Sequence, residues 1–282
     1  MNYFDLHCDT PYECYKTDVA MRRNGLAVSF DYAQLFDKWQ QVFAVWISED
    51  VENPYGLYKK IIKDFKCKAR RKPENLKPIL AVEGGAVIER NINRLEKLRE
   101  DGVKILTLTW NGENAIAGGS KSGAGLSRFG RKVIKRMNEI GLVCDFSHLN
   151  DKSFFSAIDI AERVIATHSN CRAVYDHKRN LTDEQLKLIA DKGGIIGLCF
   201  FPGFLGGDTF QKIYENIYHM LELGLENHIA IGSDFDGADM DSRLENIGDI
   251  PSLYFRLSEK GISDRVLNKI FYENAANYML NL

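Results

Sequence analysis

The strongest constraint on the fold is the regular alternation of short apolar runs with longer amphipathic segments. Eight runs have the length and the β-branched or aromatic content of buried strands, and nearly all are followed by helical periodicity. This alternation predicts a parallel sheet, and eight strands within 282 residues favour a closed (β/α)8 barrel of the TIM type. The predicted strands are residues 3–6, 41–47, 77–82, 103–110, 141–146, 163–167, 194–200 and 228–232.

The whole chain, residues 1–282, is predicted to form a single domain, because no linker, repeat or low-complexity stretch interrupts the alternation. Residues 10–40 are interpreted as polar and irregular, and the glycine-rich residues 111–125 as a flexible active-site loop. An open doubly wound sheet is the alternative fold, but it would normally carry a glycine-rich phosphate turn after its first strand. The predicted helices are residues 55–70, 86–99, 151–162, 182–192, 210–223 and 264–280, with another ending near residue 139.

Composition excludes several classes of function. A net charge of −2 gives no electrostatic footprint for nucleic acid, and no apolar run reaches the length that spans a membrane. The N-terminus shows no signal-peptide pattern. The six cysteines are widely spaced, mostly within or beside apolar runs, without a C-x-x-C pair. These features predict reduced thiols in a cytoplasmic protein.

Side chains that bind metals or transfer protons stand at the ends of five predicted strands. The carboxyl ends of barrel strands form the face that carries active sites. His7 and Asp9 are two residues apart, so an extended strand would point both to one side and Cys8 away from them. An imidazole beside a carboxylate suits a borderline metal such as zinc. The other residues at these ends are Glu83, His148, His168 and Asp234.

These three histidines and three carboxylates are hard to explain as core packing residues, because burying so many ionisable side chains without partners is costly. Five ligands are too many for one zinc with an open position, but they suit two metals that share a carboxylate. The division predicted is His7, Asp9 and Glu83 on one ion, and Glu83, His148 and His168 on the other. A hydroxide held between the ions would attack a polarised carbonyl.

The remaining acidic residue and the remaining histidines receive other interpretations. Asp234, near the ligands, is interpreted as the general base and proton shuttle. Asp236 reads as a turn or cap residue before Gly237. The three other histidines are placed away from the site: His177 in a surface loop, His219 within a helix and His228 at the opposite end of the barrel.

The motifs around these residues resemble the membrane dipeptidase (renal dipeptidase) family of zinc metallopeptidases, and the resemblance extends over almost the whole chain. It implies a (β/α)8 barrel with two zinc ions bridged by a glutamate, the same five ligands, and Asp234 as acid/base. It also implies that Arg179 holds the C-terminal carboxylate of a dipeptide, a task suited to a bidentate guanidinium. The matching motifs are residues 5–10, 83–85, 106–109, 125–130, 145–148, 168–180 and 232–237.

The chain departs from the animal members of this family after the Leu-Thr-Leu-Thr run. They carry a histidine that helps to stabilise the tetrahedral intermediate, where this chain has Trp110 followed by Asn111. Tryptophan offers a single N–H donor on a bulky ring. Stabilisation of the oxyanion would therefore come from the metal, Trp110, Asn111 or Asn114, and Trp110 and Asn111 are predicted to contact the substrate.

The leading hypothesis is a two-zinc dipeptidase acting on dipeptides with a free C-terminal carboxylate. The resemblance implies that a D-residue is often tolerated at that end and that a homodimer is possible. Another divalent metal could replace zinc. A different amidohydrolase, such as a deaminase or lactonase, is the alternative, but those enzymes typically show H-x-H on the first strand. A non-catalytic scaffold is a third reading, against which the intact set of ligands argues.

Overall fold

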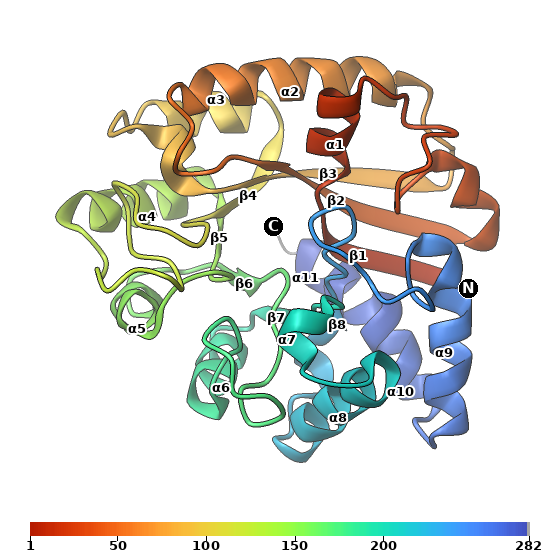
Figure 1. Cartoon of the computed structure of the whole chain (residues 1–282). Coiled ribbons are helices and arrows are strands. Elements are labelled where there is room, and N and C mark those ends of the chain that lie inside the picture. The colour runs from red at the N-terminus through yellow and green to blue at the C-terminus, as the bar shows by residue number, and fades with distance from the viewer. Residues whose placement is uncertain (281–282) are drawn as a thin grey trace.

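The computed structural model describes residues 1–280 and contains eight parallel strands. The strands are β1 (Asn2–Cys8), β2 (Lys38–Trp46), β3 (Leu76–Glu83), β4 (Val103–Thr107), β5 (Val143–Asp145), β6 (Val164–Ala166), β7 (Ile195–Leu198) and β8 (Ile229–Ile231). They pair in sequential order, and β8 returns to pair with β1 through Ile231 and Asp5. The predicted (β/α)8 barrel is confirmed, and Figure 1 shows its strands surrounded by helices.

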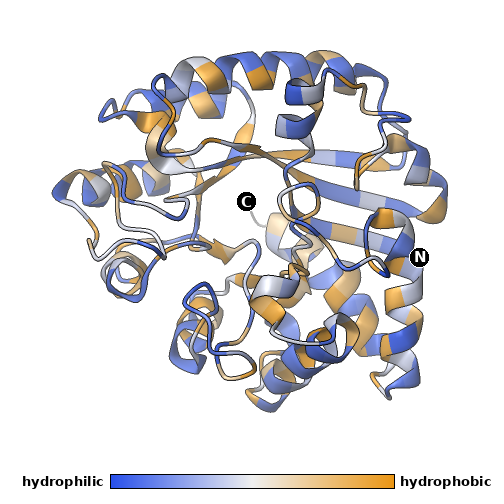
Figure 2. Cartoon of the chain, viewed as in Figure 1, coloured by the Kyte–Doolittle hydropathy of each residue, from blue (hydrophilic) through white to orange (hydrophobic). Residues whose placement is uncertain are grey.

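Helices connect successive strands on the outside of this barrel. The α-helices are α1 (Thr10–Thr17), α2 (Pro54–Lys68), α3 (Arg94–Glu100), α4 (Arg128–Ile140), α5 (Asp151–Ile158), α6 (Asp183–Asp191), α7 (Pro202–Leu205), α8 (Thr209–Glu222), α9 (Ile250–Glu259), α10 (Asp264–Asn268) and α11 (Asn274–Leu280). They alternate hydrophilic and hydrophobic stretches along their length, as amphipathic helices packed on a sheet do (Figure 2). Within residues 1–280 no helix is both long and apolar enough to cross a membrane.

Shorter helical turns complete the structure. The 3₁₀ turns are η1 (Phe30–Leu35), η2 (Ala69–Arg71), η3 (Gly85–Ile88), η4 (Glu226–His228) and η5 (Ile247–Asp249), and η6 (Lys269–Glu273) is a π-helical turn. Together with α11, η6 contacts β1 and β8. The C-terminal segment therefore packs directly against the barrel strands.

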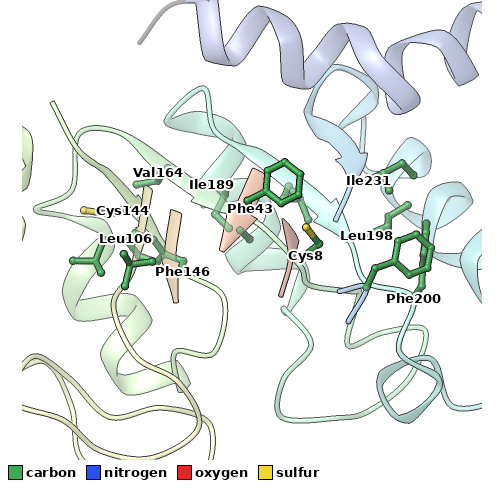
Figure 3. Close-up of a cluster of buried hydrophobic side chains, with 14 of the residues drawn as sticks. Cys8, Phe43, Leu106, Cys144, Phe146, Val164, Ile189, Leu198, Phe200 and Ile231 are labelled. Atoms are coloured by element: carbon green, nitrogen blue, oxygen red, sulfur yellow. The ribbon is translucent and has the colours of Figure 1, made fainter. Parts of the chain in front are cut away.

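The hydrophobic side chains form two layers. The inner layer takes residues such as Phe4 and Leu6 from the strands, at least one from each, and Ala275 from α11. The outer layer lies between the strands and the helices. Figure 3 shows part of this outer layer, with Phe43 and Phe200 among its larger members. Because both faces of every strand are buried, the strands read as nearly continuous apolar runs.

A register shift in β1 decides which way the first histidine points. Strict alternation would place His7 on the same side as Tyr3 and Asp5, away from Phe4 and Leu6 of the inner layer. Pairing with β2 shifts by one residue between Asp5 and Cys8, as in a β-bulge. Cys8 then joins the outer layer, as predicted, and His7 is free to join the site.

The prediction of an irregular segment from residue 10 to residue 40 is wrong. The helix α1 begins directly after Asp9, with Pro11 in its first turn, and is followed by Asp18 in a left-handed conformation. Proline suits the first turn of a helix because its φ is already helical and its missing N–H would have no partner there. The eight residues of α1 are mostly polar, so they give no clear apolar periodicity.

Two other helix predictions need correction. Residues 86–99 form the turn η3 and then α3, because Glu89 and Arg90 adopt positive φ and interrupt the helix. Residues 264–280 are divided into α10, η6 and α11 rather than one α-helix. The helix α9 was not predicted at all. The positions of all eight strands were predicted correctly, with ends that differ by a few residues.

Candidate metal centre

The predicted site residues meet at the carboxyl ends of the strands. His7 is the penultimate residue of β1, Asp9 follows that strand, and Glu83 is the last residue of β3. His148 and His168 follow β5 and β6, two or three residues after each strand ends. All five are at least 95% buried, although each carries a polar or ionisable group. The barrel topology alone brings together residues that are far apart in sequence.

Glu83 lies at the centre of this cluster and uses its two oxygens in different directions. Its Oε2 is 3.4 Å from His7 Nε2, and that nitrogen is also 3.3 Å from Asp9 Oδ2. Its Oε1 is 2.7 Å from His148 Nε2 and 3.5 Å from His168 Nε2. The carboxylate therefore belongs to two sets of ligand atoms, as a bridging ligand would.

The geometry suits metal ions better than hydrogen bonds. The ligand atoms of His7, Asp9 and Glu83 lie within 4.8 Å of one another, and so do those of Glu83, His148 and His168. His148 Nε2 and His168 Nε2 are only 2.8 Å apart, so at most one can donate to the other and both can face a shared cation. Asp9 Oδ1 is buried without a hydrogen-bond partner in the described chain. Imidazole and carboxylate donors in this arrangement fit two zinc-like ions.

The three histidines experience opposite electrostatic environments. Burial alone would lower the pKa of His7, but the carboxylates of Glu83 and Asp9 outweigh burial and raise that pKa well above its ordinary value. Burial lowers the pKa of His148 and of His168 well below the ordinary value, with smaller contributions from nearby cations. His7 therefore favours a proton or a cation, whereas the other two favour the neutral form that binds metals.

Glu83 and Asp234 hold protons more strongly than exposed acids do. Burial, together with the neighbouring charge of Asp9, raises the pKa of Glu83 to about 8. Burial raises the pKa of Asp234 to about 6. Asp234 Oδ1 lies 3.9 Å from His7 Nε2, and its side chain also falls within 4.8 Å of the ligand atoms of His7 and His168. Asp234 thus lies beside the cluster, and its pKa lies close to neutral pH.

A buried hydrogen-bond network behind the histidines was missed by the sequence analysis. Asp145 Oδ2 accepts from the hydroxyls of Thr107 and Thr167, each at 2.6 Å. The Thr167 oxygen in turn lies 2.9 Å from His168 Nδ1 and 3.4 Å from His7 Nδ1. These contacts leave Nε2 of both rings facing the ligand cluster. The position of Asp145, three residues before His148, was the available signal.

A second network fixes the region between β8 and β1. Asp5 Oδ1 accepts from the backbone N–H of Ser233 and of His7, and Asp5 Oδ2 accepts from the Ser233 hydroxyl at 2.6 Å. The next residue, Asp234, has a φ of 66°, a left-handed conformation that is uncommon outside glycine. A side chain at Gly237 would collide with the carboxylates of Asp9 and Asp234. Only glycine therefore lets this loop approach the site so closely.

A cavity of about 580 Å³ opens over the ligand cluster. Glu83, His148 and Asp234 line it together with aromatic side chains from α1, the end of β2, α7 and two connecting segments. On one side Tyr12, Trp46 and Trp110 form a chain of edge-to-face contacts, with ring centroids 4.8 and 5.1 Å apart. The other aromatic lining residues are Phe201 and Phe204. The size and mixed lining of the cavity fit a small molecule with apolar and polar parts.

Trp110 and Asn111 both line this cavity, but their surroundings differ. The Trp110 ring lies 6.5 Å from the ring of His148. Asn111 Oδ1 is 3.1 Å from His148 Nδ1 and also accepts from the Ser120 hydroxyl at 3.0 Å. This contact fixes the His148 ring with Nε2 toward Glu83. Asn111 is therefore placed to orient His148, a contact that the sequence analysis did not predict.

Arg179 is 4% exposed and lies beside the cavity lining. Its Nη2 donates to the carbonyl oxygen of His168 at 3.1 Å, and its guanidinium carbon lies 5.0 Å from the centre of the Phe204 ring. Its Nε has no hydrogen-bond partner within residues 1–280. Burial lowers the pKa of Arg179. A buried guanidinium with spare donor capacity is suited to an anionic ligand.

The remaining polar residues have other surroundings. Asp236 accepts hydrogen bonds from the Thr10 hydroxyl and from the N–H of Ala27 and Val28, so it connects loops, in the manner of a turn residue. His219 Nε2 lies 2.7 Å from Asp183 Oδ1, a hydrogen-bonding distance. These contacts lie outside the two ligand sets.

A closed barrel with histidines and carboxylates gathered at the carboxyl ends of its strands defines the class of protein: a barrel enzyme with a candidate metal centre. The model of the membrane dipeptidase family, peptidase family M19, matches residues 1–279, so the chain belongs to that family. An uncharacterised dipeptidase of Schizosaccharomyces pombe is 30% identical over 200 residues, covering 67% of this chain and 49% of that protein. The match thus spans about half the length of that relative.

Solved structures share the fold over nearly the whole chain. A dipeptidase described as a metallopeptidase of family M19 has a TM-score of 0.90 at 21% identity, with 99% of this chain and 98% of that chain covered. A metallopeptidase from Rhodobacter sphaeroides has a TM-score of 0.87 at 20% identity, with 99% of both chains covered. That protein was crystallised with a phosphinate mimic of the dipeptide L-Ala-D-Ala.

Proposed function

We propose that this protein is a dipeptidase that uses two zinc ions, or ions of similar preference, to hydrolyse dipeptides with a free C-terminal carboxylate. The observation that carries the proposal is the position of Glu83, whose two oxygens face two different sets of ligands. His7 and Asp9 would complete one set, and His148 and His168 the other. Ions bound there would polarise a carbonyl and supply a nucleophilic water at neutral pH.

Asp234 is assigned the transfer of protons. Its carboxylate borders the cavity and the ligand cluster, and with its pKa raised to about 6 it is ionised at neutral pH yet basic enough to accept a proton. The carboxylate would take a proton from the attacking water and return it to the amine that leaves. This double use of one group needs a pKa near the working pH, which burial supplies.

Arg179 is assigned the C-terminal carboxylate of the substrate. Its buried guanidinium has no carboxylate partner in the described chain, and Phe204 and the His168 carbonyl hold it in place. A bidentate contact with a carboxylate would use its unpaired Nε. The R. sphaeroides structure with a mimic of L-Ala-D-Ala supports substrates that end in a D-residue.

Trp110 is assigned to the wall that contacts the substrate. Its ring lines the cavity next to Trp46 and near His148. Asn111 is assigned mainly to holding His148, because its side-chain oxygen already meets that ring and Ser120. Only its amide nitrogen would then be left for the substrate.

The test is hydrolysis of a panel of dipeptides by zinc-loaded protein, after its metal content has been measured. The panel contains Ala-Ala with an L- or a D-residue at the C-terminal position, and each dipeptide with its C-terminus amidated. We expect cleavage of the free-carboxylate forms only, and loss of cleavage after chelation. Failure of two-metal protein to cleave any member would contradict the proposal and favour another amidohydrolase reaction.

The same panel tests the role of Arg179. Replacement of Arg179 by Ala should raise KM for free-carboxylate dipeptides by at least about tenfold, because the substrate loses a charge-assisted bidentate contact. The amidated dipeptides should remain uncleaved, as with the wild type. An unchanged KM for the free-carboxylate forms would show that another group binds this end of the substrate.

A further inference from the structure

Cys199 is held in a fixed position immediately after β7. Its backbone N–H donates to Asn170 Oδ1 at 3.1 Å, and its carbonyl oxygen accepts from Asn170 Nδ2 at 3.0 Å. The N–H of the next residue, Phe200, donates to the carbonyl oxygen of Ser233 at 3.1 Å. Cys199 and Asn170 are both at most 1% exposed. The cysteine is therefore tied to the loops after both β6 and β8.

The thiol of Cys199 contacts the carboxylate assigned to proton transfer. Its Sγ lies 3.6 Å from Asp234 Oδ2, a hydrogen-bonding distance for sulfur. The other oxygen, Oδ1, is the one that lies 3.9 Å from His7 Nε2. The two oxygens of Asp234 thus face different partners: one faces a thiol donor and the other the ligand cluster. Burial raises the pKa of the Cys199 thiol well above its ordinary value, so the sulfur keeps its proton and can donate it.

Asp234 needs such an anchor because its backbone is in an unusual conformation. Its φ of 66° is sterically unfavourable for a residue with a side chain, and the turn is closed by the Gly237 N–H donating to the Asp234 carbonyl oxygen. A carboxylate on such a loop can rotate about its side-chain bonds unless something holds one oxygen. In the described structure the Cys199 thiol is the side-chain donor that meets Oδ2.

We propose that Cys199 is a positioning residue, whose thiol donates a hydrogen bond to Asp234 Oδ2 and thereby turns Oδ1 toward the ligand cluster. The inference rests on the proposed function of Asp234 as the acid/base group. It gives a role to a cysteine that composition alone assigns to core packing. It also separates Cys199 from Cys144, another fully buried thiol, whose Sγ lies 3.8 Å from Met137 Sδ.

Kinetics of three variants test this role in zinc-loaded protein. Cys199→Ala should lower kcat about tenfold with little change in KM, because proton transfer suffers and substrate contacts do not. Cys199→Ser should recover most of that loss, because a hydroxyl also donates. Cys144→Ala is the matched control and should keep the wild-type kcat. A wild-type kcat in Cys199→Ala, or equal losses in Cys199→Ala and Cys199→Ser, would overturn the proposal.

Infrared spectroscopy detects the hydrogen bond between the Cys199 thiol and Asp234 without an activity measurement. The difference between the wild-type spectrum and that of Cys199→Ser isolates the S–H stretch of this cysteine. We expect it at lower wavenumber than the Cys144 band, and we expect it to move upward in Asp234→Ala. A band that Asp234→Ala does not move would overturn the proposal. The wild-type rate on dipeptides reports separately on the proposed function, so the two failures can be told apart.

Discussion

The two ligand sets of the site share Glu83 but differ in their other ligands and in the charge that their histidines favour. One set, which we term the acidic group, contains His7 and Asp9 with Glu83. The other, the imidazole group, contains His148 and His168 with Glu83. The pKa of His7 is raised well above its ordinary value, whereas those of His148 and His168 are lowered well below it. Histidine side chains that lie a few ångströms apart thus favour opposite charge states: His7 favours the protonated form, and His148 and His168 favour the neutral form.

This difference shows how neighbouring groups prepare a site for two cations. In the acidic group, carboxylates concentrate negative charge, and protons compensate for it until a cation replaces them. In the imidazole group, burial keeps the rings neutral and their nitrogens available as ligands. A cation therefore competes with protons in the acidic group and meets nearly free ligands in the imidazole group.

The largest effect is expected from Glu83→Gln, which removes the only residue common to both groups. Loss of the shared negative charge weakens both positions at once, so we expect less than one tightly held ion per chain and a fall in kcat of about a thousandfold or more. Elemental analysis of dialysed protein and the rate on a free-carboxylate dipeptide are the measurements. Retention of two ions in this variant would show that the groups do not depend on one bridge.

A smaller effect, confined to the imidazole group, is expected from Asn111→Ala. The variant removes the contact with His148 Nδ1 and frees the ring to turn, which should weaken one of the two ions about 10- to 100-fold. Stepwise competition with a chelator measures each ion separately. Ser120→Ala removes the other partner of the Asn111 oxygen and should have much less effect. Equal weakening of both ions by Asn111→Ala would contradict a local role.

Proton release on metal binding should distinguish the two groups directly. Metal-free Glu83, with its pKa raised to about 8, holds a proton at pH 7, and the pKa of His7 is raised as well, so zinc must displace about one proton. The number should fall as the pH rises above 8, because Glu83 then loses its proton without metal. Calorimetry in buffers of different ionisation enthalpy counts these protons. His148→Ala should leave the count unchanged, and a buffer-independent heat would rule out the protonated acidic group.

The smallest effect is expected from a histidine outside both groups. His219→Gln replaces the ring that contacts Asp183, whose side chain is 42% exposed, so the free energy of unfolding should fall by only about 0.5 kcal/mol. Chemical denaturation measures the change. Metal content and kcat should match the wild type. Loss of metal from His219→Gln would mean that the variant disturbs the barrel as a whole.

Much of the fold and the membership of the site could be predicted from sequence, for a physical reason. A parallel strand buried on both faces must be apolar along its length, so the change to His148 or Asp234 at its end stands out. Chain topology then brings these ends to one face of the barrel. His7, Asp9 and Glu83 were found in this way without any knowledge of three-dimensional contacts.

The features that were missed have either a weak local pattern or a dependence on contacts between distant segments. The helix α1 has few apolar residues, and its start depends on Pro11 more than on periodicity. The bulge that turns His7 toward the site is a property of the pairing of β1 with β2, which no local pattern encodes. The contact between Cys199 and Asp234 joins the ends of β7 and β8. The bulge in β1 and the contact between Cys199 and Asp234 become visible only once the strands are placed side by side.

The closure of the barrel through β1 and β8 also sets an order in time. His168 is the last of the five proposed ligands along the chain. The strands β7 and β8 still follow it, and both must form before β8 can pair with β1. The pairing of Asp5 with Ile231 joins nearly opposite ends of the chain, and contacts of such long range form slowly. His7 and Asp9 also contact the segment after β8, because the Asp234 N–H donates to the His7 carbonyl oxygen and the Asp9 N–H donates to the Phe235 carbonyl oxygen. The arrival of tightly held metal would therefore mark the moment at which the newly made chain has finished folding.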